Sequence, residues 1–363
     1  MERLRYWLAL LRAPGVGAIR YRQLLEHYGE PLTLFQSNRP AAETRLNTYL
    51  RNPDWEAVEK DLAWLEGDNC HLLTLNDTDY PQPLHDILDA PPLLFLRGNP
   101  EVLANPQLAI VGSRNPSITG RETAYDFART LAASGLVISS GLAQGVDTAS
   151  HQGALDGGGQ TIAVAGTGLD RVYPAANRDL AYAIIDGGGA IISEFPPGTP
   201  PHTGNFPRRN RIISALSMGT LVVEAALRSG SLITARLAAE QGREVFAIPG
   251  SIHNPLARGC HQLIRQGAKL VESAGDILEE LAPQLRAVLA EAPPQETPLG
   301  GPDLDPEYHD LLACIGHEAT PVDRLVERSG LTAEAVSSML LLLELQGFVE
   351  AAAGGYARTA KRL

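Results

Sequence analysis

The residues best suited to ligand binding form a short glycine turn, Gly112, Ser113 and Arg114. The turn follows the apolar run 108–111, which is typical of a buried strand, and leads into a helical pattern over 121–132. In this arrangement backbone N–H groups approach an anion and the helix N-terminus favours negative charge. A planar arginine adds a cation that suits phosphate oxygens. The pattern indicates a phosphate-binding loop, and a turn glycine beside a surface arginine explains it equally well.

A second group of residues, around Phe206, indicates what kind of phosphate ligand this is. The ring is followed by Arg208, Arg209, Asn210 and Arg211. Residues 200–250 hold six arginines, three glutamates and no lysine or aspartate, a local charge of +3 in a chain of net charge −12. An aromatic ring beside arginines is typical of a single-stranded nucleic-acid platform, where the ring stacks a base. The alternative is a buried Phe206 and a solvated basic face, at the start of a helix that we expect from Ile212.

Acid–base catalysis is less well supported by the sequence. Two acids, Glu194 and Glu224, lie at the carboxyl ends of predicted strands, but neither has a histidine placed for proton transfer. We interpret Asp147 and His151, four residues apart, as a helix-start carboxylate and a surface histidine. The sequence has no GxxxxGK[ST] loop, no GxGxxG run and no metal-ligand cluster, so we expect no cofactor and no metal. An enzyme acting on a nucleoside phosphate, with Glu194 or Glu224 as its acid, remains the alternative.

Short apolar strands alternate with helical stretches through the centre of the chain. The expected strands are 107–111, 135–139, 161–165, 190–193, 220–224, 244–248 and 269–271. This alternation predicts an α/β fold with a doubly wound, mostly parallel sheet. Ligands of such sheets bind beyond the carboxyl ends of the strands. Small residues gather at those ends: Gly112, Ser113, Ser117, Gly141, Gly145, Gly166 and Thr167.

The flanks of the sheet predict further domains. Residues 1–66 read as a helical domain, with a tight turn at 14–17 that resembles a helix-hairpin-helix element near Arg12, Arg20 and Arg22, or a plain pair of packed helices. A proline-rich connector (67–106) leads into the sheet domain (107–290), and a second proline-rich linker follows (291–305). Residues 306–363 fit a winged helix. Its third helix has no basic residue, so a protein contact is as well supported there as DNA reading.

Composition limits the remaining possibilities. The chain of 363 residues is acidic overall, so a nucleic-acid site must be a local patch. The three cysteines, Cys70, Cys260 and Cys314, are far apart and suggest neither a disulfide framework nor a zinc site. The N-terminal apolar stretch is interrupted by Arg12 and Pro14 and is too short for a signal peptide or a membrane span. We therefore expect a soluble cytoplasmic protein with no membrane partner.

Several long motifs occur in a fixed order. They are AIVGSRNPS (109–117), SSGLAQGVDTASHQGAL (139–155), GTGLDRVYPAANRDL (166–180), SEFPPGTPP (193–201), FPRRNRIISALS (206–217) and VVEAALRSGSLITARLAAEQGREVFAIPG (222–250). With these motifs the central domain resembles the DNA processing protein A (DprA, or Smf) family. The resemblance implies a Rossmann-like core, an N-terminal domain like a sterile alpha motif (SAM-like) and a C-terminal winged helix.

The resemblance also implies a function. It suggests a non-enzymatic single-stranded-DNA-binding protein of natural transformation, which protects incoming DNA and helps load the RecA recombinase. The family's DNA pocket falls on Gly112, Ser113, Arg114, Ser117, Gly141, Gly145, Gly166, Thr167, Phe206, Arg208, Arg209, Asn210 and Arg211. Thr203 stands where family members often carry a lysine. The family forms homodimers, which places the expected interface at His261, Ile264 and Leu270.

Overall fold

The computed structural model describes residues 2–37, 44–291, 306–316, 319–345, 348–352 and 354–359. The chain divides into two compact units, Met1–Ala282 and Pro283–Leu363. Nearly all of the predicted linker 291–305 lies outside the described residues. The other predicted boundaries, at 66, 106, 290 and 305, stay predictions.

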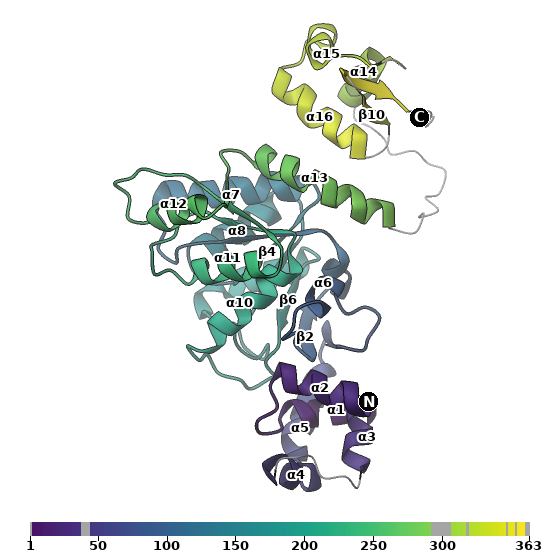
Figure 1. The fold of residues 1–363 in the computed structure, drawn as a ribbon, viewed down its shortest axis with the longest axis vertical. Helices are drawn as coiled ribbons and strands as arrows, with labels where there is room; N and C mark the ends of the chain where they lie inside the picture. The colour runs from purple at the N-terminus through teal and green to yellow at the C-terminus, as the bar shows by residue number, and fades with distance from the viewer. Residues whose placement is uncertain are drawn as a thin grey trace. The chain divides into compact units, whose positions relative to one another are not determined.

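A nine-stranded sheet forms the centre of the first unit (Figure 1). Its spatial order is β1-β2-β6-β5-β4-β3-β7-β8-β9, and every neighbouring pair from β6 to β9 is parallel. The strands are β1 (Cys70–Thr74), β2 (Leu93–Gly98), β3 (Gln107–Val111), β4 (Val137–Ser140), β5 (Thr161–Val164), β6 (Ala190–Ser193), β7 (Gly219–Val222), β8 (Glu244–Ala247) and β9 (Lys269–Leu270). The central strands are buried throughout, as expected of strands covered on both faces. The predicted mostly parallel α/β sheet is confirmed.

The sheet extends further than the apolar runs suggested. Two antiparallel strands, β1 and β2, come from the stretch expected to be a connector, and β2 pairs with β6. The prolines that gave this stretch its extended appearance lie between the strands, around the short helix α6 (Gln82–His85). Proline cannot donate to a strand ladder, which explains why it marks the connection and leaves the strands free to pair.

Strand order determines which face each helix covers. From β3 to β6 the chain moves one strand at a time in one direction, through α7 (Ile118–Ala133), α8 (Val146–Asp156) and, after the short η2 (Ala175–Asn177), α9 (Arg178–Asp186). From β6 it crosses to β7 and moves the other way, through α10 (Asn205–Leu216), α11 (Ser231–Glu240) and α12 (Arg258–Arg265). Because parallel crossovers are right-handed, the two helix sets lie on opposite faces (Figure 1). The order reverses between β3 and β7, and ligand sites of such sheets lie at that point.

Five helices precede the sheet among the described residues of the first unit. They are α1 (Glu2–Leu11), α2 (Ala18–Tyr28), α3 (Pro31–Gln36), α4 (Thr44–Arg51) and α5 (Trp55–Leu65). Trp7 is fully buried and donates to Glu30 over 2.7 Å, and their core is continuous with that of the sheet. Arg12 binds Asp61 through two hydrogen bonds of 2.6 and 2.7 Å. Arg22 donates to the carbonyl of Ile87 over 3.0 Å, so both arginines support packing rather than a phosphate at the α1–α2 turn.

The second unit is a winged helix. It contains the end of α13 (Ala274–Glu291), then α14 (Pro306–Cys314), α15 (Val322–Ser329), α16 (Ala333–Leu345) and the antiparallel pair β10 (Val349–Ala352) and β11 (Gly355–Arg358). Leu311, Leu325 and Leu343 are fully buried in its own core. The predicted three helices and β-ribbon are confirmed. The third helix has exposed serines at Ser337 and Ser338, two glutamates and no basic residue in its sequence, as the sequence indicated.

Candidate nucleic-acid interface

The loop after β3 is held against the start of α8 by close backbone contact. A Cβ on Gly112 would lie 2.6 Å from Val146, and one on Gly145 would lie 2.4 Å from the Ser113 carbonyl oxygen. Gly145 also has a φ of +85°, which L side chains rarely adopt. Val146 N–H donates to the Ser113 carbonyl over 3.1 Å. The two glycines therefore fix the direction in which the loop presents Arg114.

Ser117 is the N-cap of α7. Its hydroxyl oxygen accepts from the N–H of Gly120 over 2.9 Å, and its own N–H and hydroxyl donate to the Glu224 carboxylate over 2.8 and 2.7 Å. Asn254 donates to the same carboxylate over 3.1 Å. Ser117 is thus occupied in joining the start of α7 to the end of β7, and it does not line the hollow described next.

Phe206 joins the loop after β3 to the loop after β5. Its ring centre lies 5.6 Å from the Arg114 guanidinium. A Cβ on Gly166 would lie 2.9 Å from the ring, and Asn205 donates to the Gly166 carbonyl over 3.1 Å. The ring is half-buried, so one part packs and another is left for a ligand. The hollow beside it measures about 460 Å³, and its lining includes Gly112, Arg114, Ala143, Asp147, Tyr173, Thr203, Phe206, Arg209, Asn210, Ser229, Gly230, Ser231 and Thr234.

The helix that carries Phe206 begins earlier than the sequence suggested. It starts at Asn205 rather than at Ile212, so that prediction is wrong. Pro207 lies in the first turn, where the missing N–H has no partner within the helix. Phe206, Arg209, Asn210 and Ile213 then occupy one face, at the spacing that aligns side chains along a helix, and all four line the hollow. Arg208 and Arg211 lie three residues apart on a different face.

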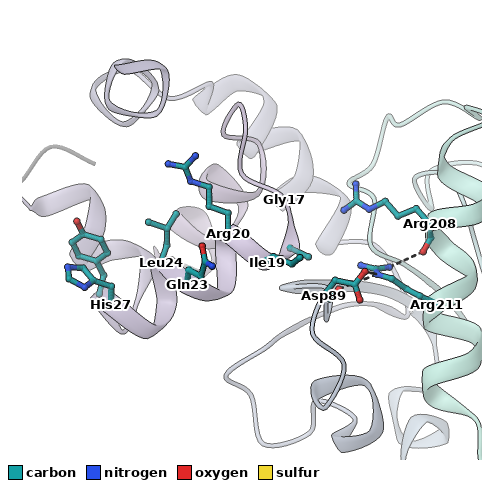
Figure 2. A pocket seen from close by; sticks show the side chains of 11 residues that line it. Gly17, Ile19, Arg20, Gln23, Leu24, His27, Asp89, Arg208 and Arg211 are labelled. Carbon is teal, nitrogen blue, oxygen red and sulfur yellow. Dashed lines mark hydrogen bonds and ion pairs between the residues drawn. The ribbon is translucent and has the colours of Figure 1, made fainter. Parts of the chain in front are cut away.

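Arg208 and Arg211 meet a buried acid on that other face. Glu194 accepts from Arg208 over 2.6 Å and from Arg211 over 2.8 Å. Arg211 is buried and also pairs with Asp89 over 2.9 Å, whereas the Arg208 side chain is half exposed and lies over the Phe195 ring. Figure 2 shows the two arginines at a second hollow, of about 780 Å³, whose opposite wall is formed by α2. The arginine cluster is therefore divided between two hollows.

Arg209 and Asp147 form the buried floor of the first hollow. Burial lowers the pKa of Arg209 to about 10, partly offset by Asp147, and burial raises the pKa of Asp147 above its ordinary value, partly offset by Arg209. Asp147 also accepts from the N–H of Ala143 over 3.2 Å. A Cβ on Gly141 would lie 2.4 Å from Arg209 and 2.6 Å from Asp147. Gly141 is therefore required for the two side chains to share this space.

His151 does not lie on the surface, so the predicted surface pair with Asp147 is wrong. Both residues are buried, and His151 is fully so. Its Nδ1 lies 2.7 Å from the hydroxyl of Thr161, and burial lowers its pKa to about 3. The helix α8 packs against α7 on one side and against β3, β4 and β5 on another, which explains why a position four residues along faces the interior.

Comparison with known proteins identifies the family. The model of the DNA recombination-mediator protein A family matches residues 71–282. This chain belongs to that family. The DprA winged helix domain matches residues 290–355. Protein Smf of Escherichia coli is 44% identical over 361 residues, which is 99% of this chain and 91% of that protein.

Two solved structures of DprA proteins resemble this chain. DNA processing protein A from Streptococcus pneumoniae has a TM-score of 0.67 and 40% identity, covering 76% of this chain and 97% of that one. DNA processing protein A from Helicobacter pylori has a TM-score of 0.53 and 30% identity, covering 59% of this chain and 97% of that one. The latter structure is described as showing a single-stranded DNA binding mode.

The two acids at the strand ends of this chain are engaged in structural contacts. Glu194 is held by Arg208 and Arg211, and Glu224 by Ser117 and Asn254. Among the described residues, no group of histidine, cysteine, aspartate and glutamate side chains could hold a metal ion. Within the same residues, no helix is long and apolar enough to cross a membrane.

The residues of the expected dimer interface lie on a separate surface, at the β9 edge of the sheet. Leu270 is 44% exposed, and Ile264 is partly buried. His261 Nε2 lies 2.9 Å from the Gly250 carbonyl oxygen. Next to this edge is a hollow of about 830 Å³ over α11, β8 and α12. The structure thus brings Arg114, Phe206, Arg209 and Asn210 together and leaves these three residues apart from them.

Two contributions to the hollow were missed from the sequence. One is Tyr173, whose ring centre lies 5.7 Å from that of Phe206. The other is the segment 229–234 at the start of α11, which supplies hydroxyl groups to the opposite wall. A sequence signal for Tyr173 existed, since an aromatic residue followed by proline lies within the motif 166–180. The 229–234 segment had no such sequence signal, because its position at the hollow depends on β7 lying beside β3.

Proposed function

We propose that this chain binds single-stranded DNA at the hollow beside Phe206. The proposal depends mainly on one arrangement, in which the Arg114 guanidinium lies 5.6 Å from the Phe206 ring centre at the point where the strand order reverses. A base stacks on an aromatic ring regardless of its identity, and arginine binds the neighbouring phosphate. Within the described part of the chain, Arg114 makes no ion pair, so its charge is available for a phosphate.

The roles of the predicted site residues follow from their contacts. We assign base stacking to Phe206, a phosphate contact to Arg114 and a polar contact to Asn210. To Arg208, which lies half exposed at the second hollow, we assign a phosphate contact outside the hollow beside Phe206. Arg209 and Arg211 are buried, so we assign them to holding α10 in place. Ser117 positions the start of α7. We assign the remaining residues to shaping the site, because protein groups fill the space beside the glycines and Thr167 is buried: Gly112, Ser113, Gly141, Gly145, Gly166 and Thr167.

We further propose that the DNA-bound protein acts in natural transformation, where it protects incoming DNA and helps load the RecA recombinase. Family membership supports this role. We propose that it works as a cytoplasmic homodimer through His261, Ile264 and Leu270. The three free cysteines suit a reducing compartment. We also propose that the chain has no catalytic activity, because both acids at the strand ends are bound by neighbouring side chains.

Fluorescence anisotropy with labelled single- and double-stranded oligonucleotides of one sequence tests this function. The account predicts that the full chain binds the single strand more tightly than the duplex, because bases within a duplex cannot reach Phe206. The same titration with residues 1–290 reports what the winged helix contributes. Equal affinity for both DNA forms, or none for either, would contradict the proposal.

A further inference from the structure

Tyr173 connects the hollow beside Phe206 to a second group of aromatic and basic side chains. It lines that hollow, and it also lines a smaller one whose walls include Arg97, Arg171 and Tyr182. Tyr173 and Tyr182 are 47% and 46% exposed, so both rings have a face open to a ligand. The surface therefore offers a series of rings leading away from Phe206.

The positions of these side chains are set by different elements. Tyr173 follows β5 in a loop fastened by Asp170, which accepts from the Gly198 N–H over 2.7 Å. Tyr182 lies in the middle of α9, and the Arg97 guanidinium, from β2, lies 5.6 Å from its ring centre. The backbone of Tyr173 is therefore held by the fastened loop, and that of Tyr182 by α9.

The chemistry of this surface suits a polynucleotide. The rings of Tyr173 and Phe206 are inclined by 32° with centres 5.7 Å apart, within the range of two rings that pack as a pair, so together they form one aromatic surface beside Arg114. Arg171 is paired with Asp170 over 2.7 Å, whereas Arg97 makes no ion pair among the described residues and is free to bind a phosphate. The smaller hollow measures about 20 Å³, so it cannot admit a base, and bases would lie on the outer ring faces.

We propose that the bound single strand continues from Phe206 over Tyr173 to Tyr182, with Arg97 as a phosphate contact at the far end. This inference rests on the proposed function and extends it, because it makes the site a track of several nucleotides. It also gives affinity a dependence on oligonucleotide length that a single pocket would not have. Tyr173 lines both hollows, so the aromatic surface beside Phe206 continues towards Tyr182. This continuity favours DNA over a protein as the occupant.

Anisotropy titrations with oligo-dT of about 4 and about 16 nucleotides, the range of site sizes in single-strand binders, test the track. Tyr182→Ala should weaken binding of the long oligonucleotide about five-fold or more, the loss of one stacking contact, and leave the short one unaffected. Arg97→Ala should lower the salt slope for the long oligonucleotide by about 0.7. Tyr182→Phe should bind as the wild type does, since it keeps the ring.

Tyr125→Ala is the matched control. Tyr125 lies on α7 with the Arg129 guanidinium 5.8 Å from its ring centre, the same arrangement without a link to Phe206. It should bind both oligonucleotides as the wild type does. The track is wrong if Tyr182→Ala and Arg97→Ala bind the long oligonucleotide like the wild type while Phe206→Ala weakens it. It is also wrong if Tyr182→Ala weakens both lengths equally. A wild-type chain that binds neither length would overturn the proposed function as well.

Discussion

The Arg114 guanidinium lies 5.6 Å from the centre of the Phe206 ring, although the two residues belong to segments that follow different strands. Two glycines fix the first residue, through the contact of the 112–114 loop with α8, and the early start of α10 fixes the second. The arrangement places a cation and an aromatic face side by side at the sheet edge. From it we derive the proposed recognition of a single strand through one base and its phosphate.

The glycine at the start of α8 should be essential for this arrangement. In Gly145→Ala the new Cβ would lie 2.4 Å from the Ser113 carbonyl oxygen, at a φ of +85°. Gly135→Ala is the matched control. Its φ is +91° and its new Cβ would have no atom within 4 Å, so it introduces backbone strain without a steric clash. We expect the control to lose about 1–2 kcal/mol of unfolding free energy and Gly145→Ala to lose more, in urea titrations. Equal losses would show that the contact with the 112–114 loop is unimportant.

The buried acid between two arginines should stabilise the fold. Glu194→Gln leaves Arg211 buried without its main carboxylate partner, and removing one member of such a pair costs about 3–5 kcal/mol. We expect the lower end of this range because Asp89 remains. Glu56→Gln, which breaks an exposed pair with Lys60, should leave the urea midpoint unchanged. A Glu194→Gln midpoint equal to that of the wild type would contradict the assignment of Arg211 to the interior.

His151 should make stability depend on pH. Burial disfavours the charged ring and lowers the pKa of His151 from its ordinary value of 6.5 to about 3 in the folded protein. Between pH 6.5 and pH 3 the unfolded chain binds a proton at His151 that the folded protein does not. The contribution of neutral His151 to the free energy of unfolding is therefore complete above pH 6.5 and is lost as the pH falls towards 3. His151→Gln should flatten this part of the profile, measured by urea unfolding at a series of pH values. The exposed His253→Gln should keep the wild-type profile, and a matching profile for His151→Gln would refute the prediction.

The acids at the strand ends should support no turnover. Purified protein incubated with nucleoside monophosphates should release no free base, since Glu224 is bound by Ser117 and Asn254. Chromatography of the reaction products measures this directly. Base release that Glu224→Gln abolishes would instead establish the enzyme alternative.

Much of this fold could be predicted from the sequence, but the positions of the arginines on α10 could not. The apolar runs identified seven of the nine strands of the large sheet because buried parallel strands are continuously apolar. The positions of β1 and β2 were obscured by the prolines between them. Phe206 and Arg114 were recognisable from residue type. The separation of Arg208 and Arg211 from Arg209 was not, because it depends on α10 beginning at Asn205.

His151 shows a second limit of the sequence. A histidine four residues after an aspartate fits an exposed pair as well as a buried position, since periodicity alone does not reveal which side of α8 faces the sheet. The tertiary packing of α8 against α7 and β4 decides it. The positions that sequence predicted well are those set by local turn chemistry, and those it missed are set by contacts between distant segments.

The central claim is tested most directly by salt-dependent anisotropy titrations of oligo-dT with Arg114→Ala and Phe206→Ala. Phe206→Ala should lose about 1–3 kcal/mol of binding free energy with little change in salt slope, because a stacking contact is removed. Arg114→Ala should lower the slope by about 0.7, the loss of one phosphate contact. Arg129→Ala, which removes an arginine from α7, should match the wild type. Wild-type affinity and salt slope in both site variants would contradict the account.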